Sequence, residues 1–253
     1  MSRNQIWRVT GALGTLIVKA TQSTEARFYQ LAASQLDVQA VHTPQLFAHY
    51  QVDGADWIVI EFVPQPLPKA RWLADVQAID QLRLLHRAEL TLPVDGWFRP
   101  KWTPQMTAAA LNYLSSSVAN TLYDLQQRAQ PIFEPTCWIS ADPNPRNWGV
   151  RANGEVVLFD WERFSRGTPA LDLAITIPGL GSLGDYHAVA GMYLNSAETA
   201  HPLVHQMILA KAWTIVEFLA NVHSGAVAET TGVAYLAQYL PQWLETVAAT
   251  ITP

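Results

Sequence analysis

Three side chains suited to metal binding and proton transfer lie close together in the sequence: Asp142, Asn147 and Asp160. Asp142 and Asn147 share one loop that contains two prolines, which stiffen the backbone and fix the directions of both side chains. Asp160 follows the apolar run VVLF, and a turn at residues 153–154 lets it return toward the loop. An amide and a carboxylate suit Mg²⁺, which takes one or two protein ligands beside phosphates and water. Asp142 then remains to accept a proton from an attacking hydroxyl.

The segments around this stretch predict two lobes. Strand patterns cover residues 6–10, 15–20, 45–52 and 56–63, and a helical pattern covers residues 24–36. Three prolines between residues 64 and 70 end the strand region. Helical patterns then follow at residues 74–90, 106–129, 185–195, 202–223 and 233–250. We therefore predict a sheet-containing N-lobe over residues 1–65 and a helical C-lobe over residues 66–253.

Composition limits the kinds of partner. With 49% hydrophobic residues the chain can bury a large core, and its single cysteine, Cys137, excludes an intramolecular disulfide framework. A reducing, cytoplasmic location is the simplest interpretation, and no run of apolar residues has the length of a membrane helix. The net charge of -5 and the absence of a Lys/Arg cluster argue against nucleic acid or an anionic membrane as the main partner.

The chemistry-bearing stretch also resembles a known family. Its sequence, WISADPNPRNWGV followed by VVLFDWERFSRGTPALDLA, is similar to the loop and strand motifs of the aminoglycoside phosphotransferase and choline kinase family. The resemblance implies an α+β, protein-kinase-like two-lobe fold with a small antiparallel-sheet N-lobe and a mainly helical C-lobe. It also implies transfer of the γ-phosphoryl group of ATP, with Mg²⁺, to a hydroxyl of a small molecule. Aminoglycosides, choline-like compounds and other amino alcohols or sugars are all acceptors in the family.

The resemblance assigns a role to each matching position. Asp142 is the catalytic base, and Asn147 and Asp160 hold the metal. The nucleotide is bound by Lys19, which pairs with Glu25, and by the backbone of a hinge strand that ends in Glu61, Phe62 and Val63. Three further residues are assigned to substrate contact or loop support: Trp161, Glu162 and Asp172.

Two departures from the family pattern are visible. Ser140 and Ala141 stand where the family has histidine and glycine. The first strand and the first half of the phosphate-covering loop have no counterpart, so either the N-lobe is shortened at its N-terminus or the true start of the protein lies upstream. Backbone amides of Ser2 to Gln5 are expected to replace part of that phosphate contact.

Other interpretations of these residues stay open. Asp142 and Asn147 are also residue types that loops use for local hydrogen bonds, and Lys19 and Glu25 could be ordinary surface charges. A catalytically inactive nucleotide-binding homologue with a scaffold or regulatory role is the alternative function. A protein kinase fits less well, because the 12 residues from Asp160 to Asp172 are too few for a long regulated loop. The identity of the acceptor and the oligomeric state are left undecided. The modest excess of acidic residues would allow the acceptor to be an amine.

Overall fold

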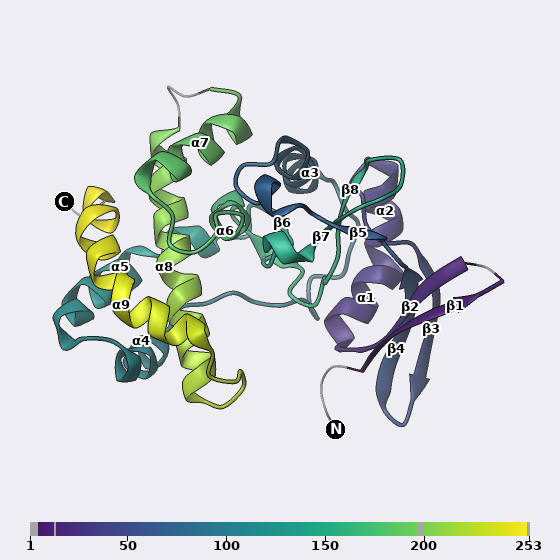
Figure 1. The fold of residues 1–253 in the computed structure, drawn as a ribbon, viewed down its shortest axis with the longest axis horizontal. Helices are drawn as coiled ribbons and strands as arrows, with labels where there is room; N and C mark the ends of the chain where they lie inside the picture. Colours follow the sequence, from purple (N-terminus) through teal and green to yellow (C-terminus); the bar gives the residue numbers. More distant parts are fainter. Residues whose placement is uncertain (1–4, 13, 197–199, 252–253) are drawn as a thin grey trace. The chain divides into compact units, whose positions relative to one another are not determined.

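The chain divides into two compact units. A computed structural model describes residues 5–12, 14–196 and 200–251 (Figure 1), so the phosphate contact predicted for Ser2 to Gln5 lies, except for Gln5, outside the described residues. By contacts between Cα atoms, the first unit comprises residues 1–99 and 136–166, and the second comprises residues 100–135 and 167–253. The boundary proposed at residue 65 therefore falls inside the first unit, which also contains the stretch from Asp142 to Asp160.

An antiparallel sheet of four strands forms one part of the first unit. Its strands lie in the order β1-β2-β4-β3, with the following bounds: β1 Ile6–Gly11, β2 Gly14–Thr21, β3 Leu46–Val52 and β4 Ala55–Glu61. All four were predicted from alternation and turn residues. The register pairs Lys19 with Ile6 on one side and with Ile58 on the other, so these three side chains share a face.

Two helices follow β2 and cover that face: α1 Ser23–Leu31 and α2 Ala33–Val38. Phe28 of α1 and Leu36 of α2 are fully buried, as is Ile58 of β4. In Figure 1, α1 and α2 lie on one side of the sheet, and no other helix or strand among the described residues of this unit lies over the opposite side. The core of this part therefore lies between the helices and the face that carries Lys19.

The rest of the first unit is built from one helix and short strands. Their bounds are β5 Gln65–Pro66, α3 Val76–Arg87, β6 Cys137–Ile139, β7 Trp148–Val150, β8 Val156–Leu158 and β9 Ser165–Gly167. Asp75 caps α3 by accepting a hydrogen bond from the Ala78 amide at 2.9 Å. Strands β5, β7 and β8 form a second sheet. Gly154, at φ +89°, makes the turn between β7 and β8 that the sequence predicted.

The second unit is helical. Its main helices are α4 Pro104–Ala110, α5 Ala119–Arg128, α6 Pro169–Ile175, α7 Leu183–Leu194, α8 His201–His223 and α9 Thr231–Thr246. The single helix predicted over residues 106–129 is wrong, because the chain is extended at Leu114 and Ser115 and two short 3-10 turns stand between α4 and α5. The Ser115 hydroxyl accepts a hydrogen bond from the Ser117 amide there, and such local bonds compete with the helix.

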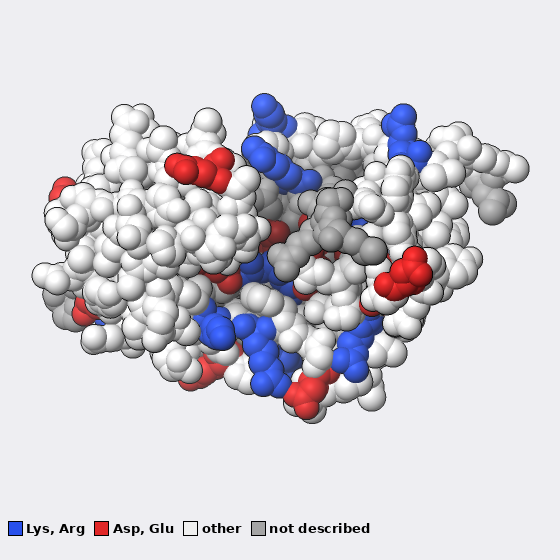
Figure 2. Space-filling model, turned by 90° about the horizontal axis from the view of Figure 1, so that it is seen from below, with Lys and Arg blue, Asp and Glu red and all other residues white. Residues whose placement is uncertain are grey.

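Helix α8 is the longest helix of this unit. Its length and composition would allow it to cross a membrane, but 61% of its apolar window is buried inside the protein, as in a core helix. Lys211 of α8 is also buried and donates a hydrogen bond to the carbonyl of Ile177 at 2.7 Å. On the face that Figure 2 shows, Lys and Arg side chains are interspersed with Asp and Glu.

Candidate active site

A cavity of about 290 Å³ in the first unit collects most of the predicted nucleotide-binding residues. Its walls are apolar except for four charged residues, Lys19, Glu25, Glu61 and Asp160. The apolar lining is contributed by Ile6, Ile17, Pro44, Ile60, Phe62, Val63 and Phe159. An apolar slot with a few polar groups at one side suits a flat base whose charged substituent lies beside those groups.

Lys19 joins the sheet, α1 and the segment after β8. Its ammonium nitrogen lies 2.8 Å from a carboxylate oxygen of Glu25 and 2.6 Å from Oδ1 of Asp160. Glu25 is fully buried and also accepts a hydrogen bond from the Thr21 hydroxyl. Burial alone would lower the pKa of Lys19, but the charges of Glu25 and Asp160 outweigh it, so the pKa of Lys19 is raised. The lysine is thus held as a cation at the wall of the cavity.

Trp161 fixes the position of its neighbour Asp160. The indole is fully buried and stacks on Phe28 of α1, with ring centroids 4.2 Å apart and planes 7° from parallel. Its Nε1 donates to the carbonyl of Leu158 at 3.0 Å. Because Phe28 lies one helical turn after Glu25, this stack sets Asp160, a predicted metal ligand, against the helix that carries the glutamate. Of the two roles predicted for Trp161, the burial supports loop support.

The loop from Asp142 to Asn147 is locked by its own hydrogen bonds. The Asn147 side-chain nitrogen donates to the carbonyl oxygen of Asp142 at 2.9 Å and to its carboxylate at 3.3 Å. Asn144 accepts from the Arg146 amide at 3.1 Å, and Trp148, which is buried, donates from Nε1 to the carbonyl of Pro143 at 3.1 Å. The predicted base and the predicted metal ligand therefore face each other across a rigid turn.

Two residues beside the predicted chemistry have left-handed backbone conformations. Ala141 has φ +58° and Asp160 has φ +68°. Neither residue is glycine, so each conformation costs about 1–3 kcal/mol that the surrounding structure must offset. Ala141 stands where the family pattern has glycine, which accepts this conformation without strain. Unfavourable backbone at both positions is typical of a functional loop.

The electrostatics of Asp142 differ from those of a surface acid. Burial raises the pKa of Asp142 to about 7; the nearby Arg163 guanidinium opposes this shift, whereas the charges of Asp160 and Glu162 add to it. The hydrogen bond from Asn147 favours the ionised form. A carboxylate with a pKa near neutrality is a stronger base than a free one and suits proton acceptance at physiological pH.

The folded state therefore binds the Asp142 proton more tightly than the unfolded chain does, and stability must fall as pH rises from about 4 to about 7. Asp142→Asn removes this ionisation. At pH 8 we expect the free energy of unfolding of the variant to exceed that of the wild type by on the order of 2–4 kcal/mol, so that the variant unfolds at a higher temperature. This gain in stability should shrink toward pH 5. Thermal unfolding at both pH values measures it. A gain that is equal at both would contradict the assignment.

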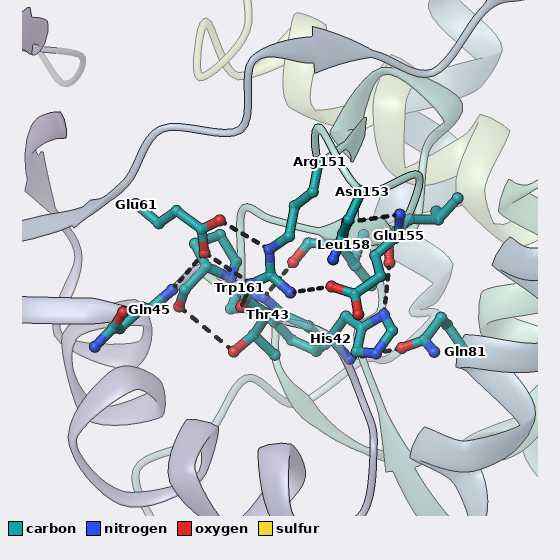
Figure 3. A network of polar contacts seen from close by, with 12 residues as sticks. His42, Thr43, Gln45, Glu61, Gln81, Arg151, Asn153, Glu155, Leu158 and Trp161 are labelled. Atoms are coloured by element: carbon teal, nitrogen blue, oxygen red, sulfur yellow. Dashed lines mark hydrogen bonds and ion pairs between the residues drawn. The ribbon is translucent and has the colours of Figure 1, made fainter. Parts of the chain in front are cut away.

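Arg151 ties the hinge strand to the β7–β8 hairpin (Figure 3). Its Nε and Nη2 lie 2.8 and 2.7 Å from the two carboxylate oxygens of Glu61, and Nη1 lies 3.0 Å from Glu155. Burial raises the pKa of Glu61, but its bonds with Arg151 outweigh this effect, and the net pKa is lowered. The Glu61 amide donates to Gln45 O at 2.9 Å. The Glu61 side chain is thus a structural anchor, and all three predicted hinge residues, Glu61, Phe62 and Val63, line the cavity.

A second set of bonds holds the segment before β3 against the same hairpin. The carbonyl of Thr43 accepts from Arg151 at 3.0 Å. His42 bonds the carbonyl of Val156 at 3.2 Å through Nδ1, and its amide donates to the Gln81 side chain of α3 (Figure 3). The hairpin also approaches the hinge closely, because a Cβ on Gly149 would lie 2.6 Å from Val63. These contacts keep the predicted metal ligands in register with the cavity.

Comparison with known proteins shows the family. Residues 2–204 match the family model described as "Phosphotransferase enzyme family". The chain belongs to the phosphotransferase enzyme family. The predicted resemblance and enzyme class are confirmed. No curated protein matches the chain.

Solved structures of this phosphotransferase's fold include three with low sequence identity. A spectinomycin phosphotransferase in complex with ADP and spectinomycin has a TM-score of 0.62 at 12% identity and covers 100% of this chain and 87% of its own. A choline kinase from Streptococcus pneumoniae has a TM-score of 0.60 at 15% sequence identity, and the match covers 98% of this chain and 91% of the choline kinase. A thermostable aminoglycoside phosphotransferase mutant in apo form has a TM-score of 0.63 at 11% sequence identity, and the match covers 100% of this chain and 93% of the mutant. The predicted α+β, protein-kinase-like fold is confirmed.

The residues of this phosphotransferase fit a magnesium ion bound mainly through a ligand. Among the described residues, no group of three or more His, Cys, Asp or Glu side chains is placed to hold a metal. Asn147 and Asp160 provide hard oxygens. The two side-chain hydrogen bonds of Asn147 to Asp142 use its amide nitrogen and not its amide oxygen. The hydrogen bond from Lys19 to Asp160 uses Oδ1. One or two protein oxygens completed by phosphate and water is the usual way proteins bind Mg²⁺.

The last two predicted residues differ in their surroundings. Glu162 is half-buried, and burial together with the charge of Asp160 raises the pKa of its carboxyl. It therefore belongs to the same charged cluster as Asp160. Asp172 is fully buried in the first turn of α6, in the second unit, where a carboxylate is favoured by the helix dipole. This environment supports a structural role for Asp172.

Proposed function

We propose that this phosphotransferase moves the γ-phosphoryl group of ATP to a hydroxyl of a small molecule. The observation that carries the proposal is the convergence of Lys19, Glu25 and Asp160 at the polar side of an apolar cavity in the same unit as the Asp142–Asn147 loop. The solved relative that contains ADP supports a nucleotide as the donor. The adenine would lie among the apolar residues near Phe62 and Val63, with the phosphates directed toward Lys19.

In this mechanism the chain mainly positions groups and accepts one proton. Asp142 orients the acceptor hydroxyl and takes its proton as the new oxygen–phosphorus bond forms and the bond to the ADP oxygen breaks. Lys19 neutralises charge on the phosphate oxygens. Asn147 and Asp160 would hold Mg²⁺, which when bound neutralises charge on the phosphates.

The acceptor class follows from the relatives and from the charge of the loop. Solved structures with this fold include aminoglycoside, choline and ethanolamine kinases. Asp160 and Glu162 both raise the pKa of Asp142, and the Arg163 guanidinium opposes them, so two carboxylates and one cation act on the predicted base. The two carboxylates and the net charge of -5 favour an acceptor that carries an amine or quaternary ammonium group. We therefore propose an amino alcohol or amino sugar.

Binding and transfer together test the proposal. ATP with Mg²⁺ at about 100 times its dissociation constant should stabilise the native chain by about 2.7 kcal/mol, which raises the unfolding midpoint by several degrees. With a panel of aminoglycosides, choline, ethanolamine and amino sugars, at least one acceptor should give ADP in proportion to phosphorylated product. Stabilisation without transfer to any acceptor would overturn the proposal in favour of an inactive nucleotide-binding homologue. Absence of stabilisation would overturn nucleotide binding itself.

A further inference from the structure

The sheet of the first unit has a second face that is apolar and open. Residues opposite one another in the register share a face, so Trp7 groups with Val18, and Val59 with both Val18 and Ala48. Counting outward from these pairs, every position of this face from Trp7 to Val59 is apolar or aromatic. We call this surface the outer face of the sheet. A face that meets only water normally alternates to polar residues.

Exposure shows that the described part of the chain leaves this face uncovered. Trp7 is 47% exposed, Val9 48%, Tyr50 59% and Val52 51%. No residue of the outer face is buried, whereas Ile58 and Ile60 on the opposite face are. The helices α1 and α2 lie against that opposite face (Figure 1). An extended exposed apolar patch on a folded domain marks an interaction site.

The outer face carries the residue types that anchor protein interfaces. Trp7 and Trp57 stack across β2 with ring centroids 5.2 Å apart, and Tyr50 lies opposite Trp57 on the next strand. Trp and Tyr supply most of the energy at interface centres. Glu61, opposite Leu16 at one end of the face, is paired with Arg151, so apolar contact must provide the attraction.

We propose that the outer face binds the same face of a second copy of this chain. A flat antiparallel sheet is complementary to another sheet about 10 Å away, and a two-fold axis makes one self-complementary patch sufficient. Four half-exposed side chains, two of them aromatic at about 150–250 Å² each, together with their less exposed neighbours, offer on the order of 500 Å² per copy. Two copies then bury about 1,000 Å², the size at which specific interfaces begin.

This arrangement leaves the proposed active site open. Lys19 and Ile60 lie on the opposite face of the sheet and line the cavity. Two sheets packed through their outer faces would therefore carry two separate cavities. Nucleotide binding is expected to be the same in monomer and dimer.

Sedimentation velocity over a concentration series tests the pairing. The wild type should be mainly dimeric at about 100 µM and should dissociate on dilution. Val9→Lys and Tyr50→Lys each place two lysines in the symmetric interface, and each should raise the dimer dissociation constant at least about tenfold. Val94→Lys is the matched control, because Val94 is 90% exposed outside the sheet and its substitution should leave the constant unchanged.

Circular dichroism shows whether each variant is folded, and Tyr50→Ser replaces Tyr50→Lys if the lysine prevents folding. A wild type that remains monomeric at about 200 µM would overturn the proposal, because an interface of this size should be occupied there. A dimer that is insensitive to both outer-face lysines would also overturn it. So would a monomer that binds phosphatidylcholine vesicles through Val9 and Tyr50, since the face would then serve a lipid surface.

Discussion

Asp142→Asn is expected to lower the turnover of phosphate transfer by about 10²- to 10⁴-fold, the usual contribution of a positioned general base. Asparagine keeps the shape of the side chain and its bond with Asn147 but cannot accept the proton. Because Asp142 lies outside the lining of the nucleotide cavity, the dissociation constant for nucleotide should change less than about threefold. Steady-state transfer assays and calorimetric titration with nucleotide give both quantities on the same preparation.

The pH dependence supplies a second readout of the same role. Asp142 must be ionised to accept a proton, and the pKa of its carboxyl is raised to about 7. The wild-type rate should therefore rise through about pH 7, while the residual rate of Asp142→Asn should be flat in that range. Arg163, whose charge lowers the pKa of Asp142, should carry part of this tuning. Equal losses of rate and nucleotide affinity in the variant would instead indicate damage to the fold.

The local part of the site could be predicted because it is encoded in a short stretch. One loop contains Asp142 and Asn147, and the end of one strand contains Asp160; the prolines and glycine between them indicate where the chain turns. Strands β1 to β4 were equally accessible, since alternation and turn residues define them. The pairing of Lys19 with Glu25 rested on the resemblance, and the structure brings both groups within hydrogen-bond distance.

The contacts that hold these pieces together could not be predicted in the same way. Arg151 and Glu61 are 90 residues apart, and neither has a sequence pattern that separates it from a surface charge. The stack of Trp161 on Phe28 similarly joins positions 133 residues apart. The apolar outer face required the strand register, which alternation within single strands does not give. Long-range pairing of this kind depends on the whole fold.

Asp160→Asn is expected to remove most of the gain in nucleotide affinity that Mg²⁺ provides. Losing one of two protein ligands should weaken magnesium-dependent nucleotide binding by about 10- to 100-fold, because even indirect supports of a metal have effects of this size. Metal-free nucleotide should bind the variant as well as the wild type or better, because a negative charge 2.6 Å from Lys19 has been removed. Lys19 would keep its bond with Glu25 and remain a cation.

Titration with ATP, once in Mg²⁺ and once in EDTA, isolates this effect as the ratio of the two affinities. Asp53→Asn is the matched control: Asp53 is exposed in the β3–β4 turn at φ +52°, a conformation that asparagine also adopts, and it lies outside the cavity. The ratio should be large in the wild type and in Asp53→Asn and close to one in Asp160→Asn. If Mg²⁺ strengthened binding equally in all three, Asp160 would act only as a partner of Lys19, and the metal ligand would have to be sought elsewhere.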